Sequence, residues 1–362
     1  MPPYPETHSI LNWVEATRAV NEIRSPNVAL QRLLFSNHET HATETIEFAI
    51  ESREPQTVRF SRPGTKAVPV DVDTWSFHNV STPLINLIRP LHAVNAYFKR
   101  TPSAAGQMIF TSAGVVRQGV NFQLAKDMQV LADFITDTIE YMCALALRGS
   151  ITIDASSYSG QLEDEAFTID FGRTGGATQL TAGTTWGSTG STMMANLQTA
   201  KRDFDARARL PVDFGICGKN AADRIRADEA FKTDADRERV DVGFLLLQEQ
   251  FNEMGLQRIG RVAGIEMWEY SRTVLSPDGS ASLDLIRPDY VELVSRSSQA
   301  GMALHFGAIA DFEALQQGVL EAERFSKTWL ERNPSAHYSM VQSRPLPILK
   351  RPNATYSIKT NA

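Results

Sequence analysis

Two short segments contain residue types that could carry out chemistry. His38-Glu39-Thr40-His41 offers two imidazoles and a carboxylate, which are common ligands of metal ions. The zincin motif needs histidines at positions i and i+4 of a helix, whereas the spacing here is three. Gly172-Arg173-Thr174-Gly175-Gly176 is rich in glycine, as phosphate loops are, but it lacks the glycine-lysine ending of a Walker A motif. We therefore predict no metal site in the first segment and no phosphate site in the second.

Nucleophilic catalysis has no visible motif either. The two cysteines, Cys143 and Cys217, belong neither to a CxxC pair nor to a cluster with histidine at zinc-site spacing. The sequence contains no GxSxG elbow and no pair of carboxylates in a recognisable setting. We therefore assign no catalytic, cofactor-binding or metal-binding residues, and we predict that the chain is not an enzyme.

Composition narrows the class of protein further. The chain has 362 residues, of which 42% are apolar and 22% are charged, as in ordinary globular domains. Its net charge of −6 argues against a protein whose main task is to grip nucleic acid backbones. The N-terminus shows no secretory pattern, and apolar stretches such as Val242 to Leu247 are too short to cross a bilayer. We expect a soluble protein of about two domains that stays in a reducing compartment and does not enter a membrane.

The first third of the chain has two distinct patterns. We predict an extended arm over residues 1–45, with a short helix at 13–23. From residue 46 apolar and polar residues alternate with the period of a strand, and the alternation resumes at 58–60 and again at 68–72. Pro63-Gly64 supplies a turn between these runs. Together they predict a long two-stranded hairpin, which is marginal on its own and should lie against something else.

A long helix is predicted next, over residues 112–147, because apolar residues from Leu124 to Leu145 follow one another at spacings of 3 and 4. A hairpin of 151–153 with 167–171 follows. Residues 172–192, rich in Gly, Thr and Ser, are then either a functional loop or an ordered segment lying on a neighbour. A mixed α/β region follows, with strands at 212–217 and 265–270 and helices at 220–228 and 243–252. Strands at 338–342 and 355–358 close the chain.

The C-terminal third contains the most recognisable residues. They are Asp278-Gly279, Leu285-Ile286-Arg287-Pro288-Asp289, Ala300-Gly301, Leu304-His305-Phe306-Gly307, Trp329 to Pro334 and, most specific of all, Tyr338-Ser339-Met340-Val341-Gln342-Ser343-Arg344-Pro345-Leu346-Pro347. In this order the motifs resemble those of the phage major capsid protein E family, typified by the lambda head protein. Gly172-Arg173 and Thr184-Thr185-Trp186 also resemble mid-chain positions of that family.

The resemblance implies an α+β fold of the Hong Kong 97 type. It divides the chain into an N-terminal arm (1–45), an extended hairpin loop (46–85), a peripheral domain (86–205) with a spine helix (112–147), an axial domain (206–328) and C-terminal strands (329–362) that return to the peripheral domain. The resemblance also implies the function of the major capsid protein of a tailed double-stranded DNA phage. Hexamers and pentamers of it would build an icosahedral shell in the host cytoplasm and form part of the virion.

The same resemblance implies partners and contact residues. A separate scaffolding protein, a portal, and a small decoration protein at the threefold positions are expected, and packaged DNA would be held without specific binding. Covalent cross-linking through Lys66 is disfavoured, because no supporting motif accompanies it. Two alternatives stay open: an encapsulin-like compartment, and a soluble α/β enzyme that uses the loop at 172–192. The residues predicted to contact neighbouring subunits are Arg59, Arg62, Pro63, Gly64, Lys66, Trp75, Gly172, Arg173 and Trp186.

Overall fold

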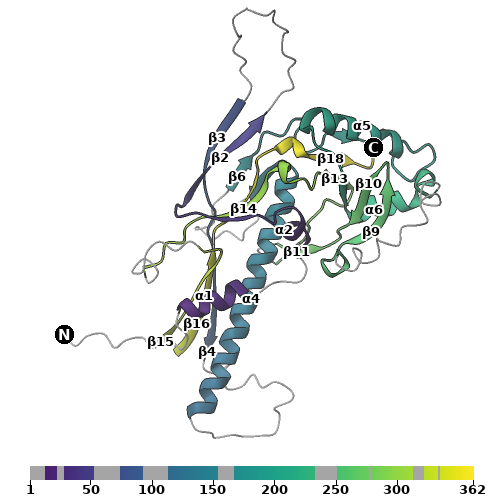
Figure 1. The fold of residues 1–362 in the computed structure, drawn as a ribbon. Helices are drawn as coiled ribbons and strands as arrows, with labels where there is room; N and C mark the ends of the chain where they lie inside the picture. Colours follow the sequence, from purple (N-terminus) through teal and green to yellow (C-terminus); the bar gives the residue numbers. More distant parts are fainter. Residues whose placement is uncertain are drawn as a thin grey trace, which may run out of the picture.

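The computed structural model describes residues 13–22, 28–52, 74–92, 113–153, 167–232, 251–276, 279–312, 322–332 and 335–362. Figure 1 shows one long helix beside a narrow sheet, a two-stranded ribbon, and a broader unit that contains the C-terminus. The helices are α1 (Trp13–Glu22), α2 (Ala29–Leu33), α4 (Ala113–Leu147), α5 (Met193–Ala208) and α6 (Lys219–Ala227), with short 3-10 turns η4 (Ser298–Ala300) and η5 (Pro352–Ala354).

The long helix α4 confirms the helix predicted over residues 112–147. It has 35 residues, so it is about 50 Å long at 1.5 Å per residue. Most members of the predicted apolar stripe are buried, from Leu124 through Met128 and Ile135 to Leu145. Gly149 follows the helix with a φ of +90°, a conformation that side chains rarely adopt. The helix therefore ends where the sequence permits a left-handed residue.

A three-stranded antiparallel sheet lies along α4 (Figure 1). Its order is β15 (Phe325–Arg332), β16 (Ser335–Ser343) and β4 (Ile85–His92). The helix α1, which confirms the helix predicted near residue 13, packs on β15, and β16 and β4 contact α4. Segments far apart in the sequence, α1 near the start and β15 in the last part of the chain, therefore lie side by side next to the long helix.

The broader unit is built on a six-stranded sheet. Its order is β7 (Leu180–Thr181), β18 (Thr355–Lys359), β13 (Tyr290–Val294), β8 (Phe214–Cys217), β10 (Ile265–Glu269) and β9 (Gln257–Val262). Phe214, Phe251 and Trp268 form an aromatic group in its core, with the rings of Phe251 and Trp268 centred 4.4 Å apart. The predicted strands at 212–217 and 265–270 and the predicted helix at 220–228 are confirmed within one or two residues.

Two features of the structure were not indicated by the sequence patterns. The helix α5 was not predicted, although Met193, Leu197, Ala200 and Phe204 are buried at spacings of 4, 3 and 4. The C-terminal strands separate in space: β16 and β17 (Pro345–Leu349) contact α4, whereas β18 lies between β7 and β13 in the six-stranded sheet. The predicted helix at 243–252 lies almost wholly outside the described residues.

Smaller sheets join these units. β1 (His38–Thr40) pairs in parallel with β14 (Met302–Phe306), which pairs with β17. β5 (Ser150–Ile153) and β6 (Phe167–Asp170) form the predicted second hairpin, and β11 (Thr273–Leu275) pairs with β12 (Ser282–Asp284). The ribbon of β2 (Thr45–Ser52) and β3 (Thr74–Ser81) extends from the body of the molecule in Figure 1. The described helices include none that is long and apolar enough to span a membrane.

Candidate assembly surface and the contacts that support it

The ribbon of β2 and β3 packs on the rest of its own chain with one of its two faces. Its strands pair in register from Thr45 opposite Ser81 to Ser52 opposite Thr74. Ile46, Phe48 and Ile50 are buried, as the predicted alternation requires, and Phe48 lies 6.3 Å from the Phe171 ring. On the other face, the Phe77 side chain is 71% exposed. One face of the ribbon therefore packs on the molecule while the other presents an aromatic side chain to solvent.

Most predicted contact residues of the hairpin lie beyond this described part. Arg59, Arg62, Pro63, Gly64 and Lys66 fall within residues 53–73, which are outside the described residues. The backbone of Trp75 is placed in β3, opposite Glu51 of β2. The described part of the hairpin is therefore its base.

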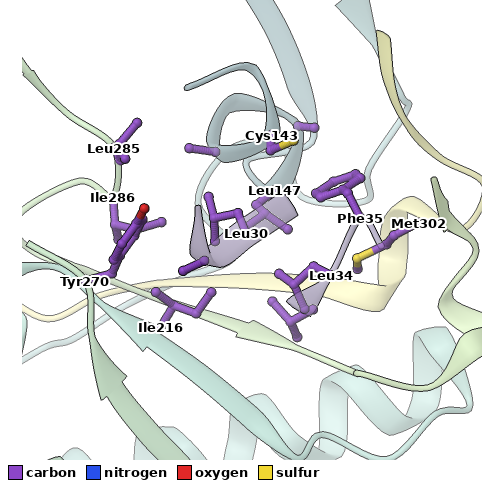
Figure 2. Close-up of a cluster of buried hydrophobic side chains, with 14 of the residues drawn as sticks. Leu30, Leu34, Phe35, Cys143, Leu147, Ile216, Tyr270, Leu285, Ile286 and Met302 are labelled. Atoms are coloured by element: carbon purple, nitrogen blue, oxygen red, sulfur yellow. The ribbon is translucent and has the colours of Figure 1, made fainter. Parts of the chain in front are cut away.

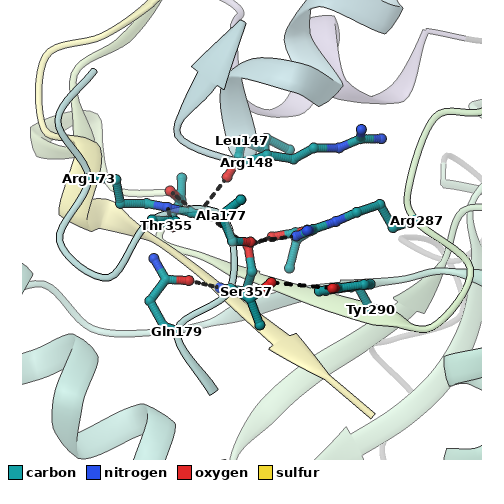
Figure 3. Close-up of polar contacts among 12 residues, drawn as sticks. Leu147, Arg148, Arg173, Ala177, Gln179, Arg287, Tyr290, Thr355 and Ser357 are labelled. Carbon is teal, nitrogen blue, oxygen red and sulfur yellow. Dashed lines mark hydrogen bonds and ion pairs between the residues drawn. The ribbon is translucent and has the colours of Figure 1, made fainter. Parts of the chain in front are cut away.

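Arg173 is placed inside its own chain, where its side chain is 5% exposed. Its guanidinium donates hydrogen bonds to the Gly176 carbonyl at 3.0 Å, the Leu147 carbonyl at 2.8 Å, Thr355 Oγ1 at 3.1 Å and Ser357 Oγ at 3.0 Å. Figure 3 shows these bonds reaching from the loop after β6 to the end of α4 and to the start of β18. Burial lowers the pKa of Arg173 to about 10. The residue joins the long helix to the six-stranded sheet.

A second arginine supports the same junction. Arg287 Nη2 lies 2.7 Å from Glu292 Oε1 and donates to the Ala177 carbonyl at 2.9 Å, and its guanidinium lies 3.5 Å from the centre of the Tyr290 ring. Ser357 Oγ bonds to the other carboxylate oxygen of Glu292. The buried Glu292 is thus shared between Arg287 and the hydroxyl that accepts from Arg173. The network is visible in Figure 3.

The Gly/Thr/Ser segment predicted at 172–192 is an ordered part of this junction. Gln179 and Ala182 donate backbone hydrogen bonds to Ser357 and Lys359 of β18, and Trp186 donates to Thr360. Trp186 is 1% exposed, whereas Gly172 is exposed with nothing near the position of a Cβ. The sequence reasoning proposed Gly172, Arg173 and Trp186 as contacts to a neighbour. Of these three, the structure leaves only Gly172 accessible.

Glu140 of α4 is a second buried junction, and the sequence reasoning missed it. Its carboxylate accepts from the backbone N–H of Leu30 at 2.8 Å, from the backbone N–H of Gln31 at 3.2 Å and from the Tyr270 hydroxyl at 2.9 Å. Burial raises the pKa of Glu140, although these hydrogen bonds oppose the shift. Glu140 lies off the predicted stripe, but it is the single charged residue in the run from Ile139 to Leu147, and that was the available signal for such a role.

The apolar surroundings of Glu140 come from three parts of the chain. Figure 2 shows Leu30 of α2 and Leu34, the residue that follows α2, among Cys143 and Leu147 of α4 and Tyr270 and Ile216 of the broader unit. Glu140 therefore holds α2, α4 and the segment after β10 in one arrangement.

The segment α1 is attached to the described body by polar contacts. Thr17 Oγ1 and Ser326 of β15 exchange hydrogen bonds of 3.1 and 3.0 Å. Asn21 Nδ2 donates to the Arg324 carbonyl at 3.2 Å, and Arg324 Nη2 donates to Thr136 Oγ1 of α4 at 2.9 Å. The N-terminal helix is thus fixed to both the narrow sheet and the long helix.

Several large apolar side chains stay exposed in the described chain. Sequence periodicity could have identified Phe134, because it lies off the buried stripe of α4. The others include Val14 of α1, Phe77 of the ribbon, and Ile88 and Leu330 of the narrow sheet. The exposed set is Val14, Phe77, Leu84, Ile88, Phe134, Leu275, Phe312 and Leu330.

Comparisons with known proteins identify the fold. The putative capsid protein of a prophage of E. coli CFT073 superposes with a TM-score of 0.70 at 16% identity, over 97% of this chain and 99% of that chain. A phage-related protein of Bordetella bronchiseptica RB50 and the capsid of cyanophage P-SCSP1u each give a TM-score of 0.49. The Bordetella protein is 12% identical and the match covers 97% of this chain and 98% of that chain. The cyanophage capsid protein is 11% identical and the match covers 94% of this chain and 91% of that chain. None of the curated proteins matches this sequence. The α+β fold is of the Hong Kong 97 type, as expected.

The family follows from the sequence as a whole. The model described as "Phage major capsid protein E" matches residues 12–360, nearly the whole chain. This match agrees with the long helix, the hairpin ribbon and the mixed α/β unit that the structure contains. The protein therefore belongs to the phage major capsid protein E family and is a structural subunit of a phage capsid, not an enzyme.

Proposed function

We propose that this capsid protein assembles into hexamers and pentamers that close into an icosahedral shell around double-stranded DNA, and that assembly takes place in the host cytoplasm. The single observation that carries the proposal is the ribbon of β2 and β3, with Phe77 on its outer face. The inner face of the ribbon packs on its own chain, whereas Phe77 leaves the outer face uncovered. A two-stranded ribbon is marginal in water on its own, and we infer that an adjacent subunit covers this outer face.

The free energy that burial of Phe77 would contribute to a subunit contact supports an assembly role. Covering one phenylalanine contributes about 1.5–3 kcal/mol. In a closed shell this contribution recurs at every copy of the contact, so a weak contact between two subunits becomes a strong determinant of the particle. We propose the untested residues of the hairpin, Arg59, Arg62, Pro63, Gly64 and Lys66, as further contacts on the same neighbour, together with Trp75.

Three further partners are proposed. A separate scaffolding protein would set the curvature of the shell, and a portal would occupy one vertex. A small decoration protein would bind at the threefold positions, where strand addition to an exposed sheet edge is a suitable mode of binding. The outer edge of β4 is such an edge within the described part of the chain, because β4 ends the three-stranded sheet.

We also propose that packaged DNA stays mobile inside the shell. The chain has 36 basic and 42 acidic residues, so its net charge of −6 releases few counterions from DNA on contact. A particle whose inner face proved strongly basic would contradict this part of the proposal.

The test is to express the full chain with its scaffolding protein and to image the products by negative-stain electron microscopy. Closed shells support the proposal, whereas small separate particles contradict it. Phe77→Ser should lower the yield of shells strongly and leave the unassembled subunit folded, because the side chain is already exposed. Asn79→Ser is the matched control, since Asn79 lies two residues along the same strand and is also exposed.

The same particles separate phage shells from an encapsulin-like compartment. Particles from infected cells that contain double-stranded DNA support the capsid function, whereas particles that enclose only a protein cargo support the compartment. If Phe77→Ser gave the same yield of shells as the unaltered chain, the ribbon face would not be the assembly contact.

A further inference from the structure

We propose that Glu39, His41 and His305 form a binding site for one transition-metal ion of the Zn²⁺ class. Among the described residues they are a group of three whose potential ligand atoms all lie within 4.8 Å of one another. This inference is independent of how the subunits assemble.

The pairing of two strands brings the three side chains together. β1 runs parallel to β14 with Glu39 opposite His305, and the backbone N–H of His41 donates to the Phe306 carbonyl at 2.9 Å. Side chains two residues apart on a strand point to the same face, so Glu39 and His41 lie on one side. His38 belongs to the other side, where its Nδ1 lies 2.9 Å from Glu323 Oε1.

The distances are close to those of a metal site. His41 Nε2 lies 2.8 Å from His305 Nδ1, and His305 Nδ1 lies 3.5 Å from Glu39 Oε2. Ligand atoms of a tetrahedral zinc ion are about 3.3 Å apart, given bonds of about 2.0–2.1 Å. An ion would therefore require the two imidazoles to separate by about half an ångström, which a rotation of the partly exposed His41 ring can provide.

The surroundings hold the donors in place. Asn37 Nδ2 donates to Glu39 Oε1 at 2.8 Å and Lys350 Nζ lies 4.0 Å from the same oxygen, which leaves Glu39 Oε2 turned toward the imidazoles. His305 is 3% exposed, and its Nε2 has no hydrogen-bond partner among the described residues. Its polar neighbours therefore lie on the Nδ1 side of the ring. Fixed orientation of ligands by neighbouring groups is a regular feature of metal sites.

The donor set selects the ion. Two imidazole nitrogens and one carboxylate oxygen suit Zn²⁺, Co²⁺ or Ni²⁺, whereas Ca²⁺ and Mg²⁺ prefer oxygen ligands alone. Three protein ligands leave a fourth position for water. The bound ion would tie β1, which precedes the ribbon, to β14 of the body. It would thus restrain the base of the hairpin.

The test is a titration of the purified full chain with Co²⁺, followed by visible absorption, and then competition with Zn²⁺. We expect one equivalent of Co²⁺ with the intense visible bands of a tetrahedral site, displaced by Zn²⁺. Zn²⁺ should also raise the melting temperature of the chain by several degrees, about 3–8 °C at saturating concentration. Absence of a stoichiometric binding event would overturn the proposal.

Variants locate the ion. His41→Gln and His305→Gln should abolish the Co²⁺ bands, and Glu39→Gln should weaken binding at least about tenfold. His38→Gln is the matched control on the same strand, and it should bind as tightly as the unaltered chain. Because His305 is buried, His41→Gln provides the decisive comparison if His305→Gln does not fold. Equal binding by His41→Gln and His38→Gln would contradict the assignment.

Discussion

Replacement of Arg173 by alanine tests whether this residue is an internal support. Each hydrogen bond from a charged group to a buried acceptor contributes about 1.5–3 kcal/mol. Arg173 makes four, to Gly176, Leu147, Thr355 and Ser357. The two hydroxyls would keep a partner, since Thr355 Oγ1 donates to the Pro352 carbonyl and Ser357 Oγ bonds to Glu292. Arg173→Ala should therefore lower the free energy of unfolding by less than the sum of four such hydrogen bonds, by about 3–5 kcal/mol.

The assay is urea unfolding of the unassembled subunit at neutral pH, followed by far-UV circular dichroism. Arg173→Lys should lower the free energy of unfolding by about half as much as Arg173→Ala, because an ammonium keeps the charge but cannot reproduce the planar set of donors. Arg207→Ala is the matched control: Arg207 donates to the Thr174 carbonyl of the same loop, but it is exposed and should cost less than about 1 kcal/mol. If Arg173→Ala cost no more than Arg207→Ala, the reasoning from the buried network would be refuted.

Four further predictions concern Glu140, Gly149 and the two cysteines. Glu140→Ala should cost about 3–5 kcal/mol in the same urea assay, because it leaves two backbone N–H groups and the Tyr270 hydroxyl unpaired; a cost below about 1 kcal/mol would contradict the assigned contacts. The pKa of Glu140 is raised in the folded chain. Between the ordinary pKa of a glutamate and this raised pKa, the folded state therefore binds more protons than the unfolded state, so the free energy of unfolding falls as the pH rises through this range. Glu140→Gln should lack this decrease when unfolding is measured across the acid range, and an unchanged slope would contradict the shift. Gly149→Ala should lower the melting temperature, since its φ is +90° and a Cβ would lie 2.7 Å from Arg173 Nε, whereas Gly172→Ala, which has a φ of +70° but free space, should lower it less. Burial raises the pKa of the Cys143 and Cys217 thiols, so both should resist a thiol reagent at mildly alkaline pH and react only in denaturant; rapid labelling of the native chain would contradict their burial.

Elements with a clear period were predictable from the sequence alone. The stripe from Leu124 to Leu145 predicted α4, and the alternation of Ile46, Phe48 and Ile50 predicted β2, because burial on one face imposes the period of the element on the sequence. The β5–β6 hairpin was found in the same way, whereas the short helix near residue 13 was predicted without a long period to support it. The helix α5 was missed because its four buried residues follow directly on a segment rich in glycine and threonine.

Contacts between distant residues needed the tertiary structure. Arg173 looked like a surface contact because its glycine-rich loop suggested exposure, but its acceptors on β18 lie more than 180 residues away along the chain. Glu140 looked like part of an ordinary helix until its partners on α2 and after β10 were placed around it.

The sequence by itself determined the family, the long helix and the strand alternation of the ribbon, because these depend on motifs and on local periods. Only the tertiary structure decided what the chemically suggestive residues do. His38 and His41 lack the spacing of a helical metal motif, yet on a strand His41 faces Glu39, and the pairing of β1 with β14 adds His305 from 264 residues away. Local spacing determines which face a side chain occupies, whereas strand pairing determines what it meets there.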